Sequence, residues 1–150
     1  SRVKVITAKW FAIVTHVFLF NLCCVAIYLL GIGILKEEIS IQEFLLYHLM
    51  QFLMQIVIAA ICYVISSFVK KNKLGIGLGV VLLLYAYDMI ARVIPDLYDY
   101  RIISPFSFAN AADILSTGKI EITAAVIGVL LLAASLGTAY IVYNKRDLAS

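Results

Sequence analysis

The stretch WFAIVTHVFLFNLCCVAIYLLGIGIL, residues 10–35, contains no Asp, Glu, Lys or Arg. An α-helix rises 1.5 Å per residue, so a run of this length reaches beyond the roughly 30 Å hydrocarbon core of a bilayer. It lacks the strict apolar–polar alternation of a membrane barrel strand. It is also longer than the apolar core of a secretory signal, which has about 7–15 residues. The sequence therefore predicts a retained transmembrane helix over residues 10–35.

Three more runs have the same character. Residues 44–69 and 122–143 carry no charged side chain, and residues 74–91 carry only Asp88. Each is long enough to cross a bilayer as a helix. We predict an all-α, polytopic membrane protein that forms one transmembrane domain over residues 1–150. The expected spans are about 10–35, 44–69, 74–94 and 121–143.

The overall composition supports this class. Of the 150 residues, 64% are hydrophobic and only 14% are charged, whereas soluble domains carry roughly 45–50% and 25%. So little charge could not cover a water-facing surface, which excludes a soluble enzyme. A nucleic-acid module is excluded as well, because no aromatic residues alternate with the basic ones as in a single-strand binder. The three cysteines show no spacing typical of a metal site or a disulfide framework.

The distribution of charge predicts the orientation. Four basic and eight acidic residues fall on one side of the predicted spans. The opposite side holds one acid, Asp147, and eight basic residues, which are Arg2, Lys4, Lys9, Lys70, Lys71, Lys73, Lys145 and Arg146. The positive-inside rule places that basic side in the cytoplasm. We therefore expect a multi-pass protein of the cell membrane with both termini cytoplasmic.

The loops between the spans differ in length. Residues 70–73 alone join the second and third spans, which must therefore be adjacent and antiparallel. The outer segment, residues 95–120, is much longer and contains Pro95 and Pro105. The residue before a proline avoids helical geometry, so a bend is expected near Ser104. Because the segment is apolar, we expect short re-entrant or interfacial helices before the last span.

A stripe of polar and small side chains runs along the second span. His48, Gln51 and Gln55 recur at spacings of three and four, which places them on one face of a helix. They are candidates for lining a substrate path. The alternative is hydrogen bonding between helices, for which His16 and Asn21 in the first span are available partners.

Two further patterns concern packing. Asp88 and Arg92 are one turn apart with the acid first, the favourable order for an ion pair at the outer end of the third span. A contact with substrate or a proton is the alternative. Small residues four apart predict close helix packing at three places. These pairs are Gly75 with Gly79, Ala124 with Gly128, and Ala133 with Gly137.

No catalytic centre is expected. The pair Glu37–Glu38 resembles the start of an EExxxR protease motif, but Gln42 stands where the arginine would be. HExxH, GxSxG and the phosphate-binding GxxxxGK[ST] pattern are absent from the sequence. We therefore expect no enzyme active site, no metal and no cofactor in this chain.

Three segments together resemble type-2 ABC transporter permeases. Residues 1–9, SRVKVITAK, resemble the cytoplasmic SRxKxxxxK segment before the third permease helix. Residues 104–108, SPFSF, followed by ADIL at 112–115, are similar to the outer segment before the last helix. The KRDL sequence at 145–148 is similar to the ending just after that helix. Their order, spacing and sidedness agree with that family.

The resemblance implies a permease subunit of an ATP-driven exporter. The chain would supply the last four of six helices, which agrees with its start at Ser1 rather than Met. It would pair with a second permease half, as a homo- or heterodimer, and with separate ATP-binding-cassette ATPase subunits that bind ATP–Mg. The residues implied to couple the ATPase to transport are Arg2, Lys4, Val5, Ile6 and Lys9.

Two alternatives stay open on the sequence alone. A small four-helix membrane protein that acts by itself, as a channel or a sensor subunit, would not bring an ATP-binding protein with it. An intramembrane hydrolase would lose activity when Glu37 and Glu38 are changed to Gln. The sequence does not indicate which substrate is moved.

Overall fold

The computed structural model describes residues 2–69 and 73–145, and every regular element in these ranges is helical. Four of the helices are long and apolar enough to cross a membrane, as predicted. The elements, in chain order, are α1 (Arg2–Leu35), α2 (Ile41–Phe68), α3 (Lys73–Val93), η1 (Pro95–Ile103), η2 (Pro105–Ala109), α4 (Ala111–Thr117) and α5 (Ile122–Lys145).

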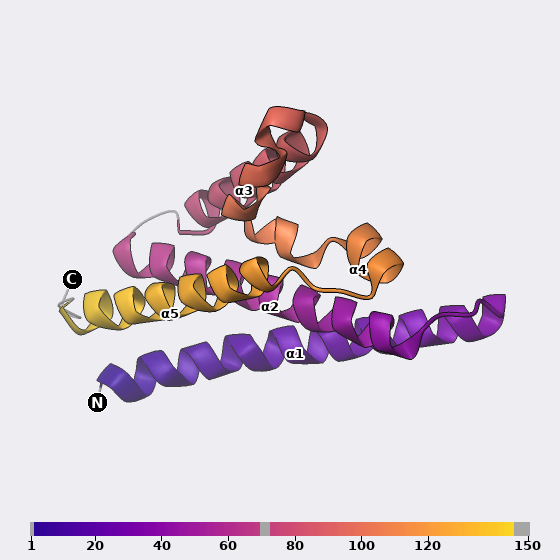
Figure 1. The fold of residues 1–150 in the computed structure, drawn as a ribbon. Helices are drawn as coiled ribbons and strands as arrows, with labels where there is room; N and C mark the ends of the chain where they lie inside the picture. Colours follow the sequence, from indigo (N-terminus) through magenta and orange to yellow (C-terminus); the bar gives the residue numbers. More distant parts are fainter. Residues whose placement is uncertain (1, 70–72, 146–150) are drawn as a thin grey trace.

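The central element is α2, against which α1 and α5 pack lengthwise (Figure 1). Its mean hydropathy is high, so most of its side chains are apolar and can pack against neighbouring helices. The buried core lies where α2, η2, α4 and α5 meet. It consists of Met50, Val57, Phe108, Ile114 and Ala124.

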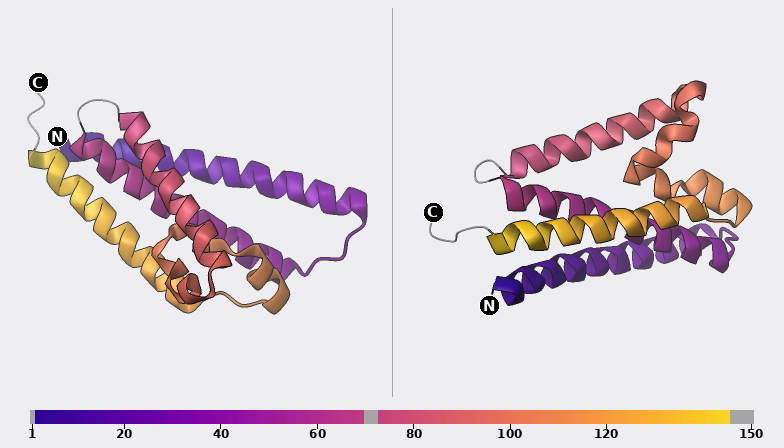
Figure 2. Two further views of the ribbon diagram at one scale, coloured as in Figure 1. Left: turned by 90° about the horizontal axis from the view of Figure 1, so that it is seen from above. Right: turned by 60° about the vertical axis from the view of Figure 1, so that its left-hand side comes forward.

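The predicted adjacency of the second and third spans holds at the end where they are joined. There Gly77 is buried, and a side chain added at this position would meet the Cys62 sulfur at 4.0 Å. Farther along, α3 diverges from α2 and α5 (Figure 2). η2 contacts all three of these helices and occupies the space between them.

The outer segment forms the bend and the short helix that its sequence predicts. Ser104 has extended backbone angles, φ −91° and ψ 129°, between η1 and η2. The short helix α4 spans Ala111–Thr117. It ends at Gly118, where φ is +64° and the amide donates to the Ile114 carbonyl. Glycine adopts this left-handed conformation without steric cost.

The small-residue pairs behave differently from one another. A Cβ on Gly128 would lie 3.1 Å from Phe108 and 3.2 Å from Leu53, so close packing is present there, beside the buried Ala124. A Cβ on Gly79 or Gly137 would meet no atom within 4 Å. The close packing predicted at these two glycines is therefore not found within the described part of the chain.

Candidate functional site

The polar stripe on α2 faces α1. The Asn21 side-chain amide donates to Gln55 Oε1 at 2.6 Å and also to the Val17 carbonyl at 2.8 Å. One turn along α2, Phe52 packs edge-on against Phe18 of α1. Gln55 therefore makes a hydrogen bond between helices, as the alternative to a substrate path predicted, and its partner is Asn21. His16 is exposed on α1.

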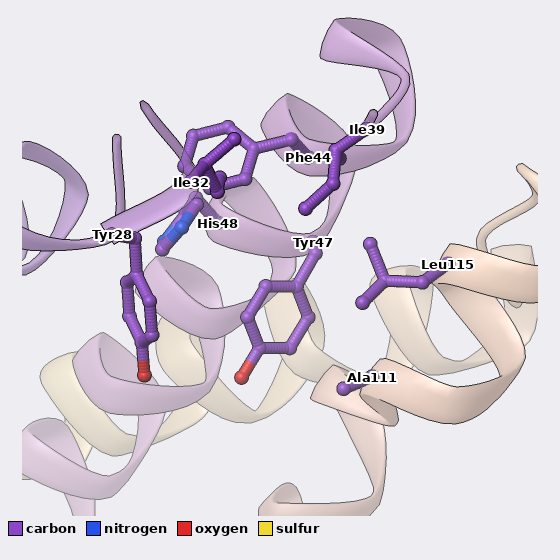
Figure 3. Close-up of a pocket in the computed structure, with 8 residues that line it drawn as sticks. All are labelled: Tyr28, Ile32, Ile39, Phe44, Tyr47, His48, Ala111 and Leu115. Carbon is purple, nitrogen blue, oxygen red and sulfur yellow. The ribbon is translucent and has the colours of Figure 1, made fainter. Parts of the chain in front are cut away.

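His48 lies in a different environment, at the acidic end of the bundle. Its side chain is surrounded by the rings of Tyr28, Phe44 and Tyr47, with centroid distances of 4.4–5.5 Å (Figure 3). The residue is 7% exposed. The Gln51 side chain, one turn away, is close enough to interact with the imidazole, but neither ring nitrogen makes a hydrogen bond of normal geometry with a described residue. Buried polar groups are ordinarily paired, so this imidazole is an exception that calls for a function.

Gln51 follows one turn later on α2. Its Oε1 is buried and, like the His48 nitrogens, has no hydrogen-bond partner among the described residues. The stripe therefore divides into two parts. Gln55 is used in helix packing, whereas His48 and Gln51 keep unused hydrogen-bonding capacity.

Asp88 and Arg92 form the ion pair that their spacing predicts. Arg92 Nε donates to Asp88 Oδ2 at 2.8 Å, and the acid side chain is only 4% exposed. The arginine also reaches the Phe106 carbonyl, with Nη2 at 3.4 Å. The pair therefore joins α3 to η2 as well as stabilising the end of its own helix.

The start of η2 reaches the middle of α3. Ser104, which is fully buried, donates from its hydroxyl to the Leu84 carbonyl at 2.8 Å. Ser107 donates back to the Ser104 carbonyl at 2.8 Å, and Phe106 packs edge-on against Tyr85. On the opposite side, Phe108 is buried against α2 and α5. The SPFSF segment is thus held between α3 and the rest of the bundle.

Arg101 in η1 was not singled out by the sequence. Its guanidinium lies 4.0 Å from the Tyr98 ring centroid, 3.6 Å from Asp113 and 3.4 Å from Glu121. Burial alone would lower the pKa of Arg101, but Tyr98 and Glu121 outweigh it and raise the pKa. Arg101 therefore stays charged and links η1 to α4 and to the residue preceding α5.

The two ends of described chain lie together at the opposite, basic end of the bundle (Figures 1 and 2). Thr7 hydrogen-bonds to the Tyr140 hydroxyl at 2.7 Å, and Trp10 packs on Tyr63. Lys9 lies 5.7 Å above the Tyr143 ring. Tryptophan and tyrosine gather where a membrane protein crosses from lipid to water. These contacts join α1, α2 and α5 at this end of the bundle.

The residues implied to couple to an ATPase are not equivalent. Val5 is 48% exposed, and Lys4 and Lys9 are exposed as well. Ile6, in contrast, is 1% exposed, and its carbonyl accepts a hydrogen bond from the Tyr63 hydroxyl at 2.8 Å. Its side chain packs inside the protein and presents no surface to a partner. The Arg2 side chain lies outside the described part of the structure.

Several other residues of the orientation argument lie outside the described parts. They are Lys70, Lys71, Arg146, Asp147 and the side chain of Lys73. Among the described residues, no group of three His, Cys, Asp or Glu side chains could hold a metal ion.

A comparison with protein-family models decides the family. Residues 1–148 match the model of the ABC-2 family transporter protein. The chain belongs to this family. No curated protein and no solved structure matches it. As an ABC-2 family transporter protein, it is a multi-pass membrane component of an ABC transporter.

The motifs that resembled the permeases have structural places in this ABC-2 protein. Residues 2–9 of the SRVKVITAK segment form the first turns of α1, continuous with the apolar span. The SPFSF segment is the buried bend between α3 and α5, and ADIL lies in α4, where Ile114 is buried in the core. Of the KRDL ending, only Lys145 lies within the described residues.

Proposed function

We propose that this ABC-2 protein is the transmembrane part of an exporter whose energy comes from a separate ATP-binding-cassette subunit. The family match over residues 1–148 is the observation that carries the proposal. ABC transporters take their energy from an ATP-binding-cassette ATPase, and the 150 residues contain no GxxxxGK[ST] phosphate-binding pattern. The partner would bind ATP–Mg, and a second permease half would complete the pathway.

The charge distribution supports an orientation with the basic end in the cytoplasm. Lys4 and Lys9 at the start of α1 lie at the same end as Lys145 at the close of α5. The opposite end carries most of the acidic residues. Basic residues close to the ends of spans are retained on the cytoplasmic side.

The length of α1 supports a contact with the ATPase. Its 34 residues extend about 51 Å at 1.5 Å per residue, compared with a hydrocarbon core of roughly 30 Å. The turns before Trp10 would therefore project toward the cytoplasm, where they offer Lys4, Val5 and Lys9. Ile6 would instead hold these turns against α2.

The outer segment fits a re-entrant element. Ser104 contacts the midpoint of α3, well away from the end of that helix at Val93. Irregular backbone is tolerated at membrane depth where protein buries it and satisfies its polar groups. Hydrogen bonds donated by Ser104, Ser107 and Arg92 pair backbone carbonyls of this segment and of α3.

The experiment starts from the full-length membrane protein, solubilised mildly and purified by a tag. An ATP-binding-cassette protein should co-purify, and ATPase activity should respond to reconstitution with the permease. Val5→Ala should lower this coupled activity several-fold, because coupling between sites is typically worth about 1–3 kcal/mol. Insertion into the membrane should not change.

Val93→Ala is the matched control, since Val93 is an exposed valine at the opposite end of the bundle. It should leave coupled ATPase activity unchanged. A protein that conducts a solute without any ATP-binding partner would instead support the stand-alone channel. If Val5→Ala and Val93→Ala had equal effects on coupled ATPase activity, the proposed contact between the start of α1 and the ATPase would be wrong.

A further inference from the structure

The His48 environment opens into a cavity between α1, α2 and α4. Its volume is about 290 Å³, and its lining is almost entirely apolar (Figure 3). Such a volume holds roughly ten water-sized or methylene-sized groups at ~30 Å³ each. The lining residues are Tyr28, Ile32, Ile39, Phe44, Tyr47, His48, Ala111 and Leu115.

A second apolar cavity lies beside the first. It has a volume of about 320 Å³ and is lined by α1, α2 and the loop that joins them. Ile32, Ile39 and Phe44 line both cavities and so form the wall between them. A ligand with an apolar chain would find hydrophobic surface in either direction, and this surface favours burial of hydrocarbon.

The polar groups define where the head of such a ligand would lie. The imidazole of His48 is more than nine-tenths buried, and neither of its nitrogens makes a hydrogen bond of normal geometry with a described residue. In Figure 3 the hydroxyls of Tyr28 and Tyr47 point to the same side of the cavity. An imidazole can donate from one nitrogen and accept at the other, so it suits a hydroxyl or an ester carbonyl.

The lack of charged side chains in the cavity lining favours an uncharged head group. The lining carries no Lys, Arg, Asp or Glu among the described residues. A phosphate or carboxylate placed against the buried His48 imidazole would find no compensating cation among these residues, which is costly. An uncharged head group loses much less.

We propose that the cavity between α1, α2 and α4 binds an uncharged, acylated amphiphile, with its head group hydrogen-bonded to His48. Monoacylglycerols have this chemistry, whether they come from the bilayer or are a substrate. The binding itself does not depend on the ATPase partnership. Only the role of the amphiphile as a transported molecule rests on the proposed function.

The test uses the full-length protein in nanodiscs and a monoacylglycerol whose acyl chain carries a photoactivatable diazirine. Labelled peptides are mapped by mass spectrometry without nucleotide. Label should concentrate on segments that contain Tyr47 and Leu115, and unlabelled monoacylglycerol should compete. A free fatty acid of the same chain length should compete at least several-fold less well at neutral pH.

Two variants and two controls address the cavity itself. Ala111→Phe fills the space and should reduce the specific label about tenfold or more. His48→Leu removes one buried hydrogen bond and should reduce it about five- to tenfold. Ala112→Phe, next to Ala111 but exposed, and His16→Leu, on the exposed face of α1, should leave it unchanged.

Equal labelling in all four variants would overturn the proposal, as would label spread evenly over the exposed apolar faces. Label that appears only after the assembly is dissociated would also overturn it, since a protein segment would then occupy the cavity. Addition of Mg–ATP to the assembled transporter identifies the source of the bound molecule. Loss of label during turnover identifies a transported amphiphile, and constant label identifies a resident bilayer lipid.

Discussion

The ion pair between Asp88 and Arg92 should respond unequally to loss of its two members. The Asp88 side chain is 4% exposed, and its Oδ1 already lacks a hydrogen-bond partner in the described residues. The Arg92 side chain is 30% exposed and has a second acceptor, the Phe106 carbonyl. Removing the arginine therefore strands a buried carboxylate, whereas removing the acid leaves a cation that still reaches water and a carbonyl.

The expected magnitudes follow from this asymmetry. Breaking a buried pair so that one charge stays uncompensated costs about 3–5 kcal/mol. Because Arg92 is partly exposed, we expect about 2–4 kcal/mol for Arg92→Gln. Asp88→Asn keeps an acceptor for Arg92 and should cost about 1 kcal/mol. The double variant should be more stable than Arg92→Gln alone, since no carboxylate is then buried.

The measurement is a double-mutant cycle on the free energy of unfolding of the full-length protein in mixed micelles. Asp96→Asn, which removes an exposed acid from η1, is the control and should fall within about 0.5 kcal/mol of the unmodified protein. Equal costs for the two single variants, with additive effects in the double variant, would refute the reasoning. Asp88 and Arg92 would then be independent of one another.

Three other outcomes are expected. Gln55→Leu should cost about 1–2 kcal/mol of unfolding free energy, because it leaves the Asn21 amide without its cross-helix partner, and Asn21→Leu in the same chain should recover part of this loss. Reduced transport per molecule at unchanged stability would instead assign Gln55 to the substrate path. Ile6→Ala should lower the free energy of unfolding in mixed micelles by about 2–4 kcal/mol. If the stability were unchanged, Ile6 would again be a candidate for contact with the ATPase. In intact cells, an impermeant thiol reagent should label a cysteine at Asp99 and not at Lys145, and the reverse pattern would invert the topology.

The four spans could be predicted from sequence because each depends on a local property. A charge-free run long enough to cross a bilayer needs no knowledge of its neighbours. The Asp88–Arg92 pair is equally local, since one helical turn separates its members. The bend before Pro105 follows from the steric restriction that proline places on the preceding residue.

Contacts between distant segments could not be predicted in the same way. Arg101 meets Asp113 and Glu121 only because η1 folds back toward α4 and the start of α5. The burial of Ile6 depends on Tyr63, which lies on another helix. Glycines occupy the alternate positions 75, 77 and 79 near the start of α3, and only the rotation of that helix brings Gly77, rather than Gly79, toward Cys62.

The bend in the SPFSF segment could be predicted from the sequence, but its position between α3 and α5 could not. Its apolar Phe108 can be buried only where Gly128 leaves room on α5, and its Ser104 hydroxyl must reach a carbonyl on α3. Both conditions are met because η2 contacts α3 on one side and α2 and α5 on the other. The ring of Phe108 therefore packs on one side, and hydrogen bonds from Ser104 and Arg92 satisfy the polar groups on the other. Packing of Phe108 alone would not stabilise irregular backbone between apolar helices, since an unpaired polar group buried there is costly.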